Sequence, residues 1–185
     1  MKATEDLKSE HRGIERMLSI AEKAAGRLST GKDVSPLVFL NVVDFFRSFA
    51  DKCHHGKEER ELFPAMEKAG IPRQGGPIGV MLLEHDQGRG FIRAMSEAAD
   101  RFGKGEATAK GELVAAVGGY VQLLRSHIYK EDNILFPMAD SVLPPAEQTR
   151  LLQAFENIEA NVIGPGVHER YHRMLDDMEK QAAAW

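Results

Sequence analysis

The stretch "CHHGKEERELFP", from Cys53 to Pro64, joins two histidines and three glutamates to a final Leu-Phe-Pro. Nearly the same pattern returns in "SHIYKEDNILFP", from Ser126 to Pro137. The residue numbers of the matching histidines, His54 and His127, differ by 73. In both copies a glutamate follows four residues after this histidine, which places the two side chains on one face of a helix, one turn apart. The repeat therefore predicts two equivalent helices that each present one imidazole and one carboxylate.

Two further histidines extend the repeat toward the N-terminus of each copy. Glu10-His11 and Glu84-His85 are the same dipeptide, offset by 74 residues. His11 and His85 also lie on the apolar stripes of their predicted helices, so both are expected to point inward. Internal repeats of this kind indicate a duplicated structural unit. The chain is therefore predicted to consist of two matched helical hairpins.

Apolar residues at spacings of three and four predict helices along most of the chain. Ser35-Pro36 is a typical start of a helix, and Pro64 is expected to bend or interrupt the helix that contains it. The stretches "STGKD", "GIPRQGGP" and "GKGEAT" separate the segments, and no alternation typical of strands is found. The predicted helices cover about 4–28, 36–69, the segment after "GIPRQGGP" to 102, the segment after "GKGEAT" to 142, 146–161 and 165–182.

Four long helices joined by short breaks favour an all-α fold, an antiparallel four-helix bundle. The bundle is expected to span residues 1–142. The extra C-terminal helices, residues 143–185, are expected to form an extension that packs on the bundle.

Composition narrows the classes of function. The 185 residues are 43% hydrophobic and 28% charged, with a formal net charge of −4, which is ordinary for a globular protein. Basic residues are not gathered into a block, so no nucleic-acid partner is expected. Cys53 is the only cysteine, which excludes a disulfide within the chain. The polar N-terminus and the lack of a long apolar run indicate a cytoplasmic protein with no membrane partner.

Four imidazoles and two carboxylates are predicted to converge in the bundle interior. An unpaired carboxylate is costly to bury, and a metal ion converts that cost into binding energy. This donor set suits iron, manganese or zinc better than calcium, and carboxylates that bridge two ions recur in helical bundles. The alternative is a bundle with core histidines and no metal. The candidate metal ligands are His11, His54, Glu58, His85, His127 and Glu131.

The sequence resembles the hemerythrin-like, or HHE cation-binding, family over roughly residues 5–141. The resemblance rests on "EHRGIERML", "HHGKEERELFP", "LLEHDQGRGF" and "HIYKEDNILFP" in this order. It implies a four-helix bundle around a non-haem di-iron centre. By this resemblance, His11 and His54 hold one iron, His85 and His127 hold the other, and two glutamates bridge them. These bridging residues are Glu58 and Glu131.

The chain departs from the oxygen-carrying hemerythrins in two respects. Those proteins have a second histidine one turn after the one matching His85, where this chain has Arg89. They also have H-x4-D where this chain has H-x3-E, so the broader HHE group is the better match. With one imidazole fewer, coordination positions stay open to oxygen, peroxide or nitric oxide. We therefore expect a di-iron protein that binds or reacts with such a ligand; the alternative is non-catalytic storage or sensing.

Other residues near the predicted ligands carry weaker signals. His55 is expected to face outward, about 100° around the helix from its neighbour His54. Tyr120 either lines the centre, as a proton donor or ligand, or is a core tyrosine with a satisfied hydroxyl. His168 and His172 are exposed helix residues, cover the entrance or supply a missing ligand. Four acids either accept hydrogen bonds from ligand imidazoles or are solvated: Glu10, Glu59, Glu84 and Asp132. The Leu-Phe pairs of the repeat are expected to pack in the core; these are Leu62, Phe63, Leu135 and Phe136.

Overall fold

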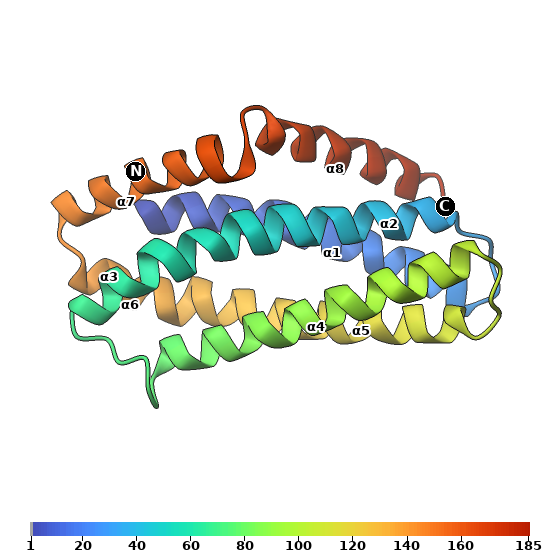
Figure 1. Ribbon diagram of the computed structural model, residues 1–185, viewed down its shortest axis with the longest axis horizontal. Coiled ribbons are helices and arrows are strands. Elements are labelled where there is room, and N and C mark those ends of the chain that lie inside the picture. The colour runs from blue at the N-terminus through green and yellow to red at the C-terminus, as the bar shows by residue number, and fades with distance from the viewer. Residues whose placement is uncertain (1) are drawn as a thin grey trace.

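The computed structural model describes residues 2–185, and all the regular elements in this range are helical. Met1, where the expected bundle domain begins, lies outside the described residues. Four helical rods form an antiparallel bundle, and two further helices lie along one side of it (Figure 1). The prediction of an all-α bundle with extra C-terminal helices is confirmed. None of the helices within residues 2–185 has the length and apolar character needed to span a membrane.

The four rods follow one another along the chain. The first rod is α1 (Ala3–Ser29), and the third is α4 (Pro77–Gly103). The second and fourth rods each contain wide, π-helical turns, written η. The second rod consists of α2 (Pro36–Phe45), η1 (Phe46–His55), η2 (Glu58–Leu62) and α3 (Phe63–Lys68). The fourth consists of α5 (Ala109–Lys130), η3 (Glu131–Leu135) and α6 (Phe136–Val142).

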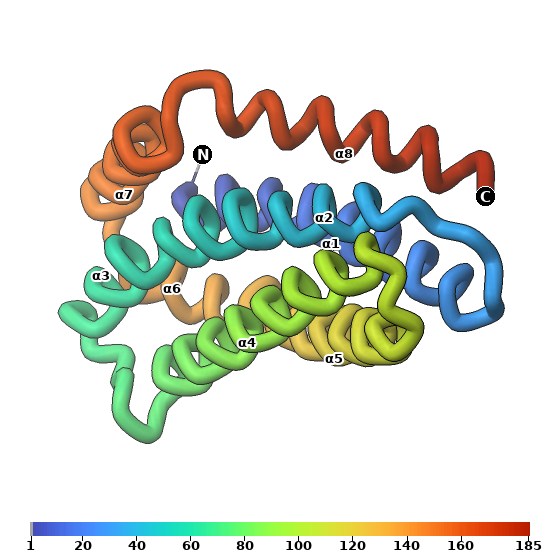
Figure 2. Tube along the Cα trace, turned by 45° about the vertical axis from the view of Figure 1, so that its right-hand side comes forward, coloured from blue at the N-terminus to red at the C-terminus, as the bar shows by residue number. Residues whose placement is uncertain are grey.

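The C-terminal helices form a cover over one side of the bundle. This segment consists of α7 (Pro145–Ile158), the wide turn η4 (Glu159–Ile163) and α8 (Val167–Ala183). Figure 2 shows α8 running along α1 and α2, with α4 and α5 on the opposite side of the bundle. Arg16 on α1 donates hydrogen bonds to Asp176 and Glu179 on α8, which fix α8 to the bundle. The helix α8 therefore covers the first hairpin, whereas α7 also contacts the second, where Gln148 donates to Asp140 on α6 at 3.3 Å.

A wide turn precedes each proline of the repeat. The backbone N–H of Phe63 donates to the carbonyl of Glu58, and that of Phe136 donates to the carbonyl of Glu131, each a π-type bond across five residues. Proline has no N–H and crowds the carbonyl of the preceding turn, so the helix widens there instead of breaking. The expected interruption at Pro64 is thus a π turn that begins at a glutamate of the repeat. Such turns are frequent at functional sites.

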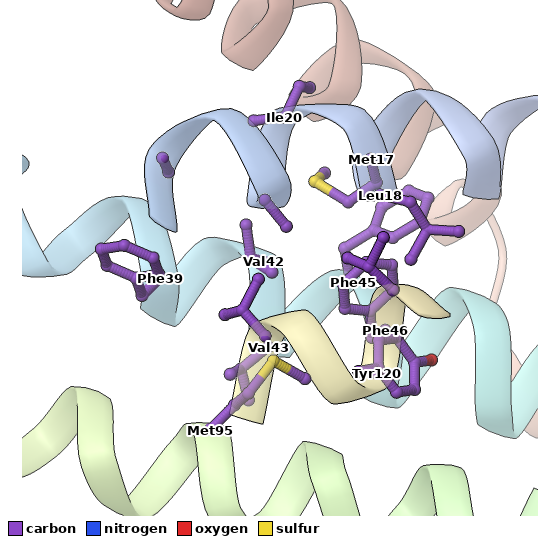
Figure 3. Close-up of a cluster of buried hydrophobic side chains, with 14 of the residues drawn as sticks. Met17, Leu18, Ile20, Phe39, Val42, Val43, Phe45, Phe46, Met95 and Tyr120 are labelled. Carbon is purple, nitrogen blue, oxygen red and sulfur yellow. The ribbon is translucent and has the colours of Figure 1, made fainter. Parts of the chain in front are cut away.

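Two apolar clusters fill the interior. The larger one lies where α1, α2, α4 and α5 meet and includes Met17, Phe46 and Tyr120 (Figure 3). The smaller one is built around the Leu-Phe pairs of the repeat and includes Leu7 and Phe155. All four residues of these pairs are buried, which confirms their packing role. In both copies of the repeat, the histidine and the glutamate precede the Leu-Phe pair at the same spacing. These polar residues therefore form a layer between the two apolar clusters.

Candidate metal centre

Four histidines from the four rods direct Nε2 atoms into the polar layer. The Nε2 atoms of His11 on α1 and His54 on η1 are 2.9 Å apart. The Nε2 atoms of His85 on α4 and His127 on α5 are 3.2 Å apart. All four residues are at most 1% exposed. The structure therefore brings the four sequence-predicted histidines together as two pairs, one from each hairpin.

Two buried glutamates join these pairs. Glu131 Oε2 lies 3.2 Å from Nε2 of His11 and 3.2 Å from Nε2 of His127, which belong to different hairpins. The oxygens of Glu58 lie 3.7 and 3.5 Å from the Nε2 atoms of the other two histidines, again one from each hairpin. Each carboxylate thus spans both halves of the layer, in the arrangement expected for a bridging ligand.

The Nδ1 atom of each histidine faces a carboxylate on its outer side. Within the hairpins, Nδ1 of His54 bonds to Glu10 and Nδ1 of His127 bonds to Glu84, both at 2.9 Å. A carboxylate at this position favours the tautomer with hydrogen on Nδ1, which leaves the Nε2 lone pair free to bind a metal.

The remaining two bonds cross from one hairpin to the other. Nδ1 of His11 lies 2.8 Å from Asp132, and Nδ1 of His85 lies 2.7 Å from Glu59. All four acids singled out beside the repeat are therefore hydrogen-bond partners of the imidazoles, and not solvated surface groups. Because the partners alternate between and within hairpins, they also fix the hairpins against each other.

The two central carboxyl groups behave differently despite their matching places. Burial and the neighbouring charge of Glu131 raise the pKa of Glu58 well above its ordinary value. Burial would also raise the pKa of Glu131, but His127 and His11 beside it hold that pKa well below the ordinary value. Without a cation, the layer therefore stabilises one charged and one neutral carboxyl group. Metal ions supply the positive charge that lets both ionise.

The residues of the layer fit metal ions. Both carboxylate oxygens of Glu58 and of Glu131 are buried and have no well-formed hydrogen bond to the described residues. A buried carboxylate without partners is costly, and a metal ion is the partner that its surroundings allow. Ligand atoms of His11, His54 and both glutamates lie within 4.8 Å of one another. The six predicted ligands thus form one compact donor set between two apolar clusters.

The expectation that His55 faces outward is wrong. His55 is 3% exposed, and its ring lies over that of His85, with centroids 3.8 Å apart. A ring nitrogen of His55 lies within 4.8 Å of ligand atoms of Glu58, His85 and His127. The expectation assumed the rotation per residue of an α-helix, but His55 ends the π-helical segment η1, where that rotation is smaller. Two consecutive histidines can therefore both face the interior.

Two lysines that the sequence did not predict as site residues donate hydrogen bonds to the outer acids of the centre. Lys57 Nζ donates to Glu10 Oε1 at 2.8 Å, and Lys130 Nζ donates to Glu84 Oε1. Each lysine thus holds the acid that orients a histidine of its own hairpin. The signal was present, because Lys57 and Lys130 are themselves 73 residues apart and each precedes a repeated glutamate.

Arg89 and Tyr120 also have defined places. Arg89 lies on the outside and donates to Asp51, Asp86 and Glu59, so it supports the acid that orients His85 without entering the layer. Tyr120 is fully buried, with its ring 4.6 Å from that of Phe46. Its hydroxyl has no hydrogen-bond partner among the described residues, and burial raises the pKa of its phenol. Tyr120 is therefore a core residue, but the expected satisfied hydroxyl is not found.

His168 and His172 lie over the covered side of the centre. His168 Nε2 is 3.6 Å from Glu10 Oε1, and the rings of the two histidines are 4.7 Å apart. Phe49 separates them from the interior, with centroids 5.1 and 5.7 Å from theirs. His168 therefore reaches an outer acid of the centre, and neither residue contributes to the central donor set.

Comparison with known proteins identifies the family to which this sequence belongs. The model of the hemerythrin HHE cation-binding domain matches residues 2–139, which include all six residues of the donor set. The chain belongs to the hemerythrin HHE cation-binding family. Membership in this family implies binding of iron or another cation, and α7 and α8 lie beyond the matched residues.

Several relatives align with this HHE protein. The uncharacterized protein Rv1995 of Mycobacterium tuberculosis is 27% identical over 179 residues, covering 96% of this chain and 69% of the relative. The iron-sulfur cluster repair protein YtfE of Edwardsiella ictaluri is 30% identical, covering 68% of this chain and 57% of the relative. The YtfE of Musicola paradisiaca is 38% identical over a shorter match, covering 46% and 40%. No solved structure gives a significant match.

Proposed function

We propose that this HHE protein holds a pair of non-haem iron ions and binds or reacts with a small ligand, namely oxygen, nitric oxide or peroxide. In this proposal His11 and His54 hold one ion, and His85 and His127 hold the other. Glu58 and Glu131 bridge them. The observation that carries the proposal is the convergence of four Nε2 atoms on two buried carboxylates whose oxygens have no well-formed hydrogen bond to the described residues.

When bound, the iron pair supplies positive charge and positions at which a small molecule can coordinate and exchange electrons. The residues of the chain supply the surroundings. The outer acids keep hydrogen on Nδ1 of each imidazole, so that Nε2 stays available. The apolar clusters exclude bulk water, and Phe136 and Phe63 stack on His11 and His85, with centroids 5.4 and 5.9 Å apart, which restricts the rotation of these rings.

The donor set favours a reactive centre over a purely structural polar core. Four imidazoles and two carboxylates leave several positions of a six-coordinate iron pair without a protein ligand. The relatives named as iron–sulfur cluster repair proteins support chemistry at iron. Non-catalytic storage or sensing is the second candidate, because the same donor set holds iron without turnover and its ligands are almost fully buried.

The first experiment is to load the purified protein with ferrous iron without oxygen, desalt it thoroughly and measure iron per chain. About two irons per chain are expected from the paired-carboxylate arrangement. His54→Ala and Glu131→Ala should lose iron, whereas His172→Ala, which changes a histidine outside the donor set, should retain it. If the two substitutions leave the iron content unchanged, the assignment of the ligands is wrong.

A second experiment separates the two candidates. The iron-loaded protein is mixed with hydrogen peroxide, or with nitric oxide together with an excess of a chemical reductant that supplies electrons for each turnover, and consumption is followed beyond one equivalent. Continued turnover that is lost in Glu131→Ala supports a reactive centre. Binding that stops at a stoichiometric amount supports storage or sensing instead.

A further inference from the structure

His55 is a buried imidazole that the six-residue donor set does not use. Neither Nδ1 nor Nε2 of His55 has a hydrogen-bond partner among the described residues, although the residue is 3% exposed. A buried polar group without a partner destabilises the folded protein, so its presence calls for a partner such as a metal ion. Within the polar layer, the other unpartnered atoms are the oxygens of Glu58 and Glu131, the atoms that face the proposed metal. His55 therefore resembles the two central glutamates, because its buried polar atoms also have no hydrogen-bond partner among the described residues.

The surroundings of His55 repeat those of the other four histidines. Its Nδ1 lies 3.5 Å from Oδ1 of Asp51, so a carboxylate stands on its Nδ1 side as it does for the other four. This contact is longer than the hydrogen bonds of the others, which measure 2.7 to 2.9 Å. A carboxylate on this side favours hydrogen on Nδ1 and leaves Nε2 as a free electron pair. Asp51 is itself fixed, because Arg89 Nε donates to the same oxygen at 2.9 Å.

Arg89 connects this arrangement to the departure from the oxygen-carrying hemerythrins. It stands where those proteins have a further histidine, and here it anchors the acid behind His55. His55 in turn lies beside His85 and His127, with a ring nitrogen within 4.8 Å of their ligand atoms. An imidazole from η1 therefore lies next to the ligand atoms of the His85–His127 pair.

We propose that His55 is a fifth histidine ligand, bound to the ion that His85 and His127 hold. The inference rests on the proposed function, because it requires that iron pair. It makes the two ions unequal: one has two histidines and the other has three. The ion held by His11 and His54 then keeps one more position open to a small ligand than the other ion does.

The orientation of the His55 ring allows a competing explanation, in which His55 packs against His85 and binds no metal. The rings of His55 and His85 are nearly parallel, at 14°, whereas His85 and His127 lie at 62° with centroids 4.8 Å apart. Rings bound to one ion diverge from it, so His55 must turn away from the stacked orientation to bind. If it stays stacked, His55 only packs against His85.

Mössbauer spectroscopy of protein loaded with iron-57 and oxidised tests the proposal, because the quadrupole splitting reports the ligands of each iron. The wild-type protein should show two doublets of equal area, one from each unequal ion. His55→Phe keeps an aromatic ring against His85 and should retain both irons, and its two doublets should merge because each ion then has two histidines. The control His172→Phe, which changes a histidine outside the centre, should give the wild-type spectrum.

A single doublet from wild-type protein with about two irons per chain overturns the assignment of His55, and this measurement needs no variant to fold. Wild-type doublets that persist unchanged in His55→Phe also overturn it and leave the stacked arrangement. Less than two irons in the wild-type protein would instead contradict the proposed function, so the two failures are distinguishable.

Discussion

Lys57 and Lys130 occupy matching places in the two hairpins but differ in exposure. Each donates to the glutamate that orients a histidine of its hairpin. The side chain of Lys57 is fully buried, whereas that of Lys130 is 30% exposed. The difference comes from the C-terminal cover, because Glu159 on η4 accepts from Lys57 at 2.5 Å and the ring of Phe155 on α7 lies 5.4 Å away. The duplicated centre is thus embedded in unequal surroundings.

This inequality predicts that equivalent substitutions have different costs. Lys57→Met leaves the acids around it, Asp6, Glu10 and Glu159, without their shared cation, and should destabilise the protein by about 3–5 kcal/mol. Lys130→Met should cost less than about 1 kcal/mol, because the pair is partly solvated. Urea denaturation of both metal-free variants measures this. Equal losses would show that the C-terminal cover does not distinguish the hairpins.

The outer acids should control metal affinity without being ligands. Glu59→Gln removes the carboxylate that faces Nδ1 of His85 and should weaken iron binding by roughly 10- to 100-fold. Glu61→Gln is the matched control, because Glu61 pairs with Arg150 on the surface. Competition with a coloured chelator gives both affinities. Similar affinity in the two variants would remove Glu59 from any role in positioning.

The two buried tyrosines should respond in opposite ways to loss of the hydroxyl. Tyr120→Phe removes a buried hydroxyl without a protein partner and should leave stability unchanged or raise it by about 1 kcal/mol. Tyr171→Phe should cost about 1–2 kcal/mol, because the Tyr171 hydroxyl donates to Asp44 at 3.0 Å and accepts from Arg170. Thermal denaturation of both variants compares them. A large loss in Tyr120→Phe would indicate an interaction of its hydroxyl within the folded protein.

The metal-free and loaded proteins should differ in their dependence on pH. Burial alone would lower the pKa of His127, but Glu131 and Glu84 raise it to about 9, and the pKa of Glu58 is also raised. A raised pKa in the folded state contributes stability that is present at low pH and lost as pH rises. The metal-free protein should therefore lose the contribution of His127 between about pH 6.5 and 9.

Iron binding displaces the protons from these same groups, so iron affinity should rise over this pH range. The melting temperature, measured from pH 6 to 9 with and without iron, checks both statements. The gain from iron should grow with pH. A constant gain would mean that iron binding does not displace protons from this layer.

Much of the fold follows from local patterns. The helix boundaries agree closely, because apolar spacing, Ser35-Pro36 and the glycine-rich breaks act within a few residues of where they occur. The six candidate ligands could be chosen for the same reason: the repeat fixes which side of each helix faces inward. His55 could not be placed in this way, because its orientation depends on a widened turn and not on α-helical spacing.

The sequence by itself determined two matched hairpins, their inward imidazoles and carboxylates, and membership of the HHE family, because duplication and helical periodicity are visible in the order of residues. Only the tertiary structure decided which acid orients which histidine, since His11 with Asp132 and His85 with Glu59 join residues of different hairpins. It also decided that Lys57 is buried and Lys130 is not. The cross-hairpin pairs depend on how the two hairpins pack against each other, and the burial of Lys57 depends on which surface the α7–α8 layer covers. Packing between distant segments sets both outcomes, and the spacing of residues within one helix does not.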